Sequence, residues 1–292
     1  MIFLLGSIVL SSWLTLSFKI IERLKIPMLQ AIVVNYGVCV ITGSVFNGAS
    51  PFHSQLVRQP WLGWALLMGL TFIFLFNIIG FTTQKLGVSV ASVANKLSLV
   101  IPFIFSIYLY HEKATVLKVT GVIVALVAVV LTCWPSGNRE PSGKKFVPVL
   151  LFLPLVLFIG SGLLDTMIKF VERTHLNDGN KNDFLITAFA VAGMIGLLIL
   201  VTLLALKKEK FDRRSIGAGI MIGVPNYFSI WFLVQVLKQF ADDSSKIIPL
   251  NNMGIVLFST VAAWIFFREK LSALNWLGIF FSLGAIALIA YG

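Results

Sequence analysis

One stretch of this sequence occurs twice, and that repetition constrains the fold more than any other feature. Residues 95–121 read NKLSLVIPFIFSIYLYHEKATVLKVTG and residues 252–278 read NMGIVLFSTVAAWIFFREKLSALNWLG, a shift of 157 positions (252 − 95). The aligned identities are Asn95 with Asn252, Glu112 with Glu269, Lys113 with Lys270, Leu117 with Leu274 and Gly121 with Gly278. Charged residues are scarce in this chain, so a matched Glu-Lys pair between two apolar runs rarely arises by chance. Each copy predicts a buried helix, a tight charged corner and a second helix.

The composition places the chain in a membrane. Hydrophobic residues make up 58% of it and charged residues only 12%, whereas soluble domains carry about 45–50% and about 25%. The net charge of +11 comes from basic residues in short loops between apolar runs, where they act as topology determinants. Nucleic acid is therefore not expected as a partner. Cys39 and Cys133 lie inside apolar segments and are expected to be core residues, not a disulfide or a metal pair.

Ten apolar segments approach the roughly 20 residues that a spanning helix needs. They are residues 2–18, 29–46, 61–81, 88–110, 116–134, 147–168, 184–206, 216–237, 247–267 and 276–291. The connections are short, and the longest are residues 47–60, 135–146 and 169–183. The fold class we expect is an all-α membrane protein with ten transmembrane helices.

The repeat extends along the whole chain. Lys19-Ile20-Ile21-Glu22-Arg23 aligns with Lys169-Phe170-Val171-Glu172-Arg173 at a shift of 150, Gly43 with Gly196 at 153, and Gly63 with Gly217 at 154. Helices one to five therefore repeat as helices six to ten, in residues 1–134 and 147–292, joined by the Pro-, Gly- and Ser-rich linker 135–146. Because each half holds an odd number of spans, the second half enters from the opposite side. We expect two inverted five-helix repeats, the arrangement typical of secondary transporters.

With these features the chain resembles the EamA-type carriers of the drug/metabolite transporter superfamily. The resemblance rests on five plus five spans, on Glu112 and Glu269 at equivalent corners, and on Gly121 and Gly278 in the helices that follow. It implies two inverted bundles around a central cavity lined by helices three, four, eight and nine. It also implies that helices five and ten are peripheral.

The direction of insertion has two conflicting indications. Loops after odd-numbered helices hold 14 Lys and Arg residues and loops after even-numbered helices hold 6. The positive-inside rule then puts both termini outside, with Lys207–Arg214 as the strongest block. The family resemblance implies both termini inside. A bacterial inner membrane is the expected location.

Polar residues within the spans are the candidate substrate-binding residues, because such groups usually face a bundle interior or a water-filled cavity. We select Asn77, Asn95, Lys96, Asn226, Tyr227, Trp231 and Asn252. Lys96 can meet an anionic group, or it can snorkel to the nearer interface or pair with a carboxylate. For Asn252 and its neighbour Asn251 the alternative to binding is a hydrogen bond between helices.

Helix eight carries an aromatic and polar face. Tyr227, Trp231 and Gln235 lie at a spacing of four residues, which places them on one side of a helix. We also expect three prolines, Pro102, Pro225 and Pro249, to interrupt or loosen their helices, and discontinuous helices are typical of a transporter site. An ordinary membrane kink is the alternative.

Asp165 is the candidate coupling carboxylate. Its neighbour four residues on is Lys169, so a local ion pair is the simpler interpretation. The alternative is a proton-coupling role, which desolvation would favour by raising the pKa of the carboxyl. The corner residues Glu112 and Glu269 are interpreted as structural, each accepting backbone N–H bonds from the start of the next helix.

Several function classes lack their residues. His53, His111 and His175 are predicted to lie in loops, and no HExxH or CxxC motif occurs, so no metal site, cofactor or enzyme activity is expected. Without GxxxxGK[ST] there is no ATP hydrolysis by this chain.

The predicted function is a secondary carrier of a small organic metabolite, such as an amino acid, an organic acid or an amphipathic drug. It would work by alternating access and, by analogy, as an exporter. The alternative is a membrane-embedded lipid-handling protein or enzyme on the same scaffold. The expected partners are the small-molecule substrate and the bilayer. Gly278, Gly284 and Ala285 leave a homodimer face and internal packing as alternatives.

Overall fold

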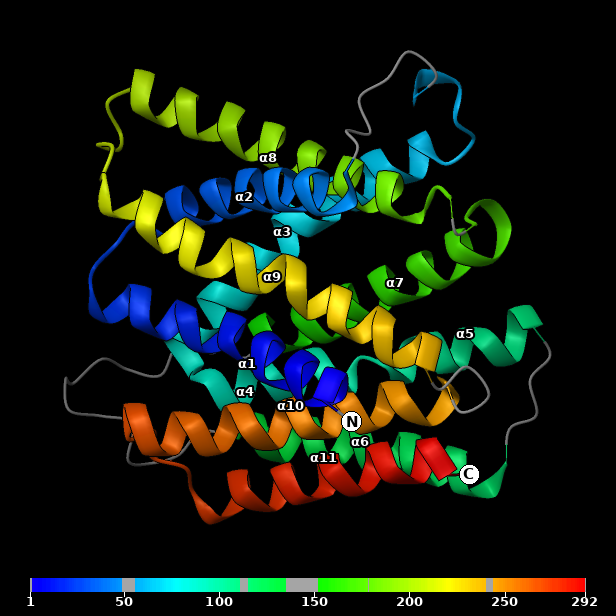
Figure 1. The fold of residues 1–292 in the computed structure, drawn as a ribbon. Helices are drawn as coiled ribbons and strands as arrows, with labels where there is room; N and C mark the ends of the chain where they lie inside the picture. The colour runs from blue at the N-terminus through cyan, green and yellow to red at the C-terminus, as the bar shows by residue number, and fades with distance from the viewer. Residues whose placement is uncertain are drawn as a thin grey trace. The chain divides into compact units, whose positions relative to one another are not determined.

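The computed structural model describes residues 2–48, 56–110, 115–134, 152–177, 179–239 and 244–291. Within these ranges ten helical segments are long and apolar enough to cross a membrane, which confirms an all-α, multi-pass membrane protein. The predicted linker 135–146 lies outside the described residues, as do Glu112, Lys113, His53 and His111. The helices, shown in Figure 1, are α1 (Ile2–Arg23), α2 (Met28–Asn47), η1 (Leu56–Arg58), α3 (Leu62–Leu86), α4 (Val88–Leu97), α5 (Val100–Tyr110), α6 (Val116–Cys133), α7 (Phe152–His175), α8 (Lys181–Ala205), α9 (Arg214–Gln239), α10 (Ser244–Phe267) and α11 (Ala273–Tyr291).

The chain forms two compact units, and each takes segments from both sequence halves. The first unit holds residues 1–19, 78–163 and 229–292, and the second holds residues 20–77 and 164–228. The unit boundaries thus cut through α1, α3, α7 and α9. The units are compact contact clusters, and the sequential halves 1–134 and 147–292 stay a prediction about the repeat.

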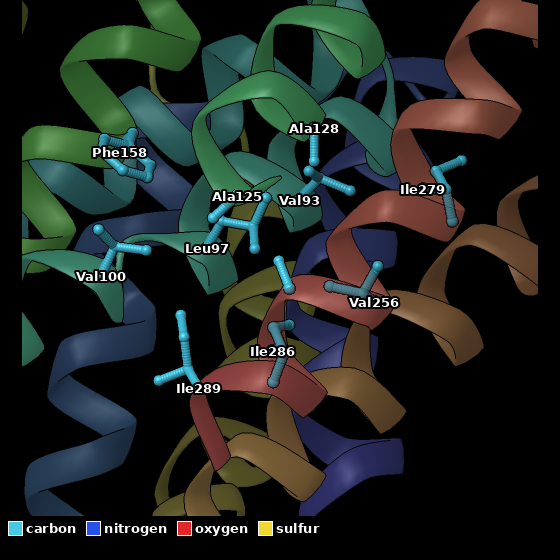
Figure 2. Close-up of a cluster of buried hydrophobic side chains, with 11 residues drawn as sticks. Val93, Leu97, Val100, Ala125, Ala128, Phe158, Val256, Ile279, Ile286 and Ile289 are labelled. Carbon is cyan, nitrogen blue, oxygen red and sulfur yellow. The ribbon is translucent and has the colours of Figure 1, made fainter. Parts of the chain in front are cut away.

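The core of the first unit is built where α6 lies against α11. A Cβ added to Gly121 would come within 3.1 Å of the Ala285 carbonyl, and one added to Gly278 within 3.0 Å of the Ala128 carbonyl. Side chains from α4, α10 and α7 close the cluster, as Figure 2 shows for Val93, Val256 and Phe158. In lipid, helix association depends on such close packing because the tails are as apolar as the side chains.

In the second unit α2 and α8 pack together, and glycines again allow the close approach of the two helices. Added Cβ atoms at Gly43 and Gly196 would come within 2.9 Å of Ile186 and Val33, respectively. A separate apolar cluster around the buried Trp61 and Phe184 fills the space between α3, α7 and α8.

The fourth span is broken, and the other proline-containing helices are not. The helix stops at Leu97 and resumes at Val100, so α4 and α5 form one span in two pieces. Pro102 has no N–H for the Ser98 carbonyl, which instead accepts from Ile101 N at 2.9 Å in a tighter turn. By contrast α9 and α10 continue through Pro225 and Pro249. The expectation of interrupted helices in both halves was therefore wrong, because a spanning helix tolerates the missing bond.

One predicted loop is largely helical. The connection predicted at residues 169–183 shrinks because α7 continues to His175, so His175 ends a helix and does not lie in a loop. Lys181 and Glu172 form an ion pair at 3.3 Å across the shortened turn. The drop in hydropathy at Lys169 marks the end of the apolar segment, and the helix itself runs further.

Glu269 caps a helix, but a different one from the helix expected. Its carboxylate accepts from Val88 N at 2.6 Å and from Ser89 N and Ser89 Oγ at 3.3 and 2.8 Å, so it caps α4. Gly87 has a φ of 104°, and a side chain there would collide with the Glu269 carboxylate. The helix that follows Glu269, α11, is capped by Ser272 and Asn275 instead.

The packing of α11 predicts opposite effects for two of its glycines. In Gly278→Ala the added methyl meets backbone atoms of α6, and we expect a loss of about 1–3 kcal/mol and a clearly lower Tm. In Gly284→Ala the methyl meets nothing within 4 Å, so we expect a gain in stability of about 0.5–1 kcal/mol and a slightly higher Tm, because Ala favours the helix more than Gly does. Thermal unfolding of the purified protein in detergent measures both. Equal Tm losses would contradict the assigned packing face.

The Glu269 cap predicts a second difference between two acidic residues. Glu269→Ala removes three bonds to the start of α4, and we expect a cost of about 2 kcal/mol. Glu172→Ala removes a solvent-exposed ion pair and should cost less than about 1 kcal/mol. The two Tm values, measured side by side, test the cap, and a smaller loss in Glu269→Ala than in Glu172→Ala would refute it.

Candidate functional site

The first unit brings three of the candidate residues onto two helices that pack together, α4 and α10. Asn95, Lys96 and Asn252 are all half-buried there. Asn95 and Lys96 occupy the last turn of α4, directly before the break, and the Asn95 carbonyl accepts from Ser98 Oγ at 2.5 Å. A cation in the last turn of a helix complements the negative end of its dipole. Lys96 also takes part in an interaction with its surroundings.

Unsatisfied polar atoms accompany these residues on the same two helices. Asn251 is only 3% exposed, and its Oδ1 has no hydrogen-bond partner. The buried hydroxyls of Ser92 on α4 and Thr260 on α10 also lack partners. Buried polar groups are normally paired, so these three atoms are free to accept or donate a further hydrogen bond. Sequence reasoning noted Asn251 but not Ser92 or Thr260, because Ser and Thr are common in spanning helices.

The second unit contains a buried amide pair. Asn226 Nδ2 donates to Asn35 Oδ1 at 3.1 Å, and Cys39 Sγ donates to the Gly223 carbonyl at 3.4 Å. Asn35 is fully buried and Asn226 is 6% exposed, while Asn35 Nδ2 has no partner. Asn226 is therefore a link between α2 and α9, and its substrate role stays a prediction. Asn35 was missed because its partner, Asn226, lies 191 positions further along the chain. Cys39 is buried as predicted.

The aromatic residues predicted on one face of helix eight have different neighbours. Tyr227 is buried in the second unit, where its ring lies 6.2 Å from that of Phe46. Trp231 belongs to the first unit, and its ring meets Phe3 edge-on at 6.0 Å. Both rings are packed within their own units, and a role in stacking on a substrate stays a prediction.

The last two candidates are engaged or exposed. Asn77 Nδ2 donates to the Ile73 carbonyl one turn earlier at 2.7 Å, so one of its donors serves its own helix. Asp165 is exposed on α7, and both it and Lys169 take part in interactions. Neither the ion pair nor the coupling role of Asp165 is tested by these positions.

Gln30 is a residue that the sequence did not point to. Its fully buried side chain donates to the Lys210 carbonyl at 2.8 Å and accepts from Asp212 N at 2.9 Å, fixing the α8–α9 connection to α2. Beside it Arg214 pairs with Asp212 at 2.7 Å. The hydrogen bonds from the Arg214 guanidinium hold the pKa of the Asp212 carboxyl below its ordinary value.

In the described ranges, no group of three or more His, Cys, Asp or Glu side chains is placed to hold a metal ion. The polar side chains in the interior of the described spans are mainly amides and hydroxyls, with the ammonium of Lys96 on α4 and the carboxylate of Asp165 on α7. These groups recognise a ligand by hydrogen bonds and charge.

Comparison with known proteins supports the fold. No family model matches the chain. A Haemophilus influenzae protein described as uncharacterized is 28% identical over 298 residues, covering 99% of this chain and 97% of that protein. A crystal structure with 15% sequence identity superposes with a TM-score of 0.61, covering 98% of this chain and 94% of its own. At that identity the likeness concerns the fold alone.

The Asn35–Asn226 pair predicts non-additive effects on stability. Asn226→Leu removes the amide donor to buried Asn35 Oδ1, which keeps only the weak Cys39 Sγ–H donor at 3.7 Å, and we expect a loss of about 1–3 kcal/mol. The double variant Asn35→Leu/Asn226→Leu removes both amides and should regain part of that loss. Thermal unfolding of the two single variants and the double variant measures the coupling. Strictly additive losses would mean that the two amides do not interact.

Proposed function

We propose that this protein is a secondary transporter of the EamA type in the drug/metabolite transporter superfamily. It moves a small organic metabolite across the membrane by alternating access between two inverted five-helix repeats. The observation that carries the proposal is that the repeat read from the sequence also relates the packing contacts. Contacts made by a residue in one half recur, with the partners exchanged, for its equivalent in the other.

The first unit supplies one such exchange. Gly121 of α6 meets Ala285 and Ile289 of α11, while Gly278 of α11 meets Ala128 and Thr132 of α6. Adding 157 to 121, 128 and 132 gives 278, 285 and 289. Each contact of Gly121 with α11 therefore has an equivalent contact of Gly278 with α6.

The second unit supplies two more exchanges, at the shifts of 153 and 154. Gly43 meets Ile186 and Tyr227, and Gly196 meets Val33 and Ile73. Adding 153 to 43 and 33 gives 196 and 186, and adding 154 to 73 gives 227. The contacts of Gly43 and Gly196 are therefore equivalent under the repeat.

The other exchange in this unit involves Gly69 and Gly223. Gly69 meets Ala188 and Val191, and Gly223 meets Asn35 and Val38. Adding 154 to 69 gives 223, and adding 153 to 35 and 38 gives 188 and 191. Equivalent contacts with exchanged partners therefore also occur among α2, α3, α8 and α9.

The direction of these contacts favours inverted halves. Gly121 near the start of α6 meets Ile289 near the end of α11, and Gly278 near the start of α11 meets Thr132 near the end of α6, so the two helices are antiparallel. Equivalent helices that run in opposite directions require opposite entry into the membrane. Secondary transporters with inverted repeats carry their sites near the bilayer midplane, often beside discontinuous helices.

The substrate site we favour uses the level of α4 and α10 that holds Asn95 and Asn252. These two residues are repeat equivalents, both are half-buried, and the α4–α5 break follows Asn95. The repeat is asymmetric at the next position, where Lys96 stands opposite Met253. Lys96 would meet a carboxylate or phosphate on the substrate, and the amides of Asn95 and Asn252 would orient it by hydrogen bonds.

Counterflow in proteoliposomes tests the function and the role of Lys96 together. With a panel of amino acids and organic anions, we expect the wild type to exchange at least one class. We expect Lys96→Ala to lose about tenfold or more for anionic substrates, because a charge-assisted hydrogen bond is removed. Lys85→Ala, which removes an exposed cation at the end of α3, is the matched control.

Three outcomes are distinguishable. Loss in Lys96→Ala but not in Lys85→Ala supports the site. Equal transport of anions by wild type and Lys96→Ala refutes the role of Lys96 and leaves the carrier function intact. No exchange of any compound by a folded wild type would count against the carrier itself.

A further inference from the structure

The corner between α10 and α11 contains a hollow that the proposed transport function does not use. Its volume is about 640 Å³, and its polar lining comes from Arg268, Glu269 and Lys270 in the turn. Its apolar lining comes from Trp264, Ile265, Leu271 and Trp276. All of these residues belong to the first unit.

The hollow has a net positive lining. Arg268 and Lys270 are both exposed, and neither forms an ion pair with a residue in the described part of the chain. The carboxylate of Glu269 is directed at α4, where both of its oxygens accept hydrogen bonds from Val88 and Ser89. The positive end of the α4 dipole offsets that negative charge. Two cations therefore remain available to an anion in the hollow.

The apolar side of the hollow includes exposed residues at the end of α10. Trp264 and Ile265 are each 55% exposed, and Phe266 is 72% exposed. Trp264 lies in the last turn of α10, and Trp276 lies in the first turn of α11. Tryptophan is enriched at this depth because its ring suits the boundary between headgroups and acyl chains.

We propose that this corner binds the headgroup phosphate of an anionic phospholipid. The Arg268 guanidinium can donate two parallel hydrogen bonds to phosphate oxygens, and the Lys270 ammonium adds a point charge. The indole rings of Trp264 and Trp276 pack on the glycerol backbone and the first acyl carbons. A free phosphate ion would use the two cations but not the apolar lining, so a lipid fits the whole site.

The bound lipid would also influence the candidate substrate site indirectly, through α4. Glu269, between the two cations, is hydrogen-bonded to the start of α4, and the last turn of α4 holds Asn95 and Lys96. A headgroup held at the corner restrains the turn that caps α4. Lipid composition would then influence the helix that carries the only basic candidate for substrate binding.

Native mass spectrometry of the full-length protein, extracted with mixed phosphatidylglycerol and phosphatidylcholine, tests the site. We expect the wild type to retain phosphatidylglycerol in preference to phosphatidylcholine. The variant Arg268→Gln/Lys270→Gln should reduce the retained phosphatidylglycerol by about five- to twentyfold, since each cation near an anionic surface has a sizeable effect. The charge-preserving variant Arg268→Lys/Lys270→Arg should keep most of the preference.

A matched control removes two cations elsewhere. Lys207→Gln/Lys208→Gln takes the same charge from the exposed α8–α9 turn, and Lys207 shares the positive φ of Arg268 at 54° and 52°. This control should retain the lipid as the wild type does. Equal lipid loss in the two Gln variants would overturn the site as a general charge effect. Displacement of the lipid by millimolar inorganic phosphate would overturn the lipid as its occupant.

Discussion

The fold depends on how closely two helices can approach in a solvent as apolar as their own side chains. Where Gly121 meets α11 and Gly278 meets α6, backbone atoms lie where a methyl group would otherwise stand. Inside a bilayer there is little hydrophobic gain from burying one aliphatic surface against another, so dispersion at short range provides the attraction. A glycine at each crossing lets the two backbones come close enough for the neighbouring side chains of both helices to make such short contacts. The apolar cluster of the first unit follows from that approach, because α4, α7 and α10 pack around the α6–α11 pair.

The spans were predictable because hydropathy and length report directly on the bilayer, and the ten helical segments agree with the ten predicted ones. The helix ends were less accessible, since α7 continues for seven residues beyond the predicted end at Ile168, through a charged segment to His175. Proline was ambiguous for a related reason. The missing N–H of Pro102 coincides with a real break, whereas α9 and α10 absorb the same defect at Pro225 and Pro249. Local sequence does not reveal which neighbours will satisfy a freed carbonyl.

The sequence identified some residues of the candidate site and missed others. Lys96 and Asn252 were found because charged and amide groups are rare within apolar segments, and they do lie on two helices in contact. Asn35 and Gln30 were missed because their importance depends on a partner that is distant in sequence. Ser92 was missed because the sequence does not reveal that its hydroxyl is buried without a partner. The Glu269 cap illustrates the limit: its chemistry was predictable, but its acceptor role serves a helix that begins 181 positions earlier. Periodicity and composition carry no information about such pairings.

The make-up of the first unit has a consequence for the order of assembly during synthesis. Ser7 of α1 donates to a carbonyl 222 positions later, and Ser12 to one 243 positions later. A chain made from its N-terminus therefore inserts α1 long before α9 and α10 exist. Contacts of such high sequence separation form late and slowly. The nascent protein must hold its first helix in the membrane with those hydroxyls provisionally satisfied until nearly the whole chain has left the ribosome.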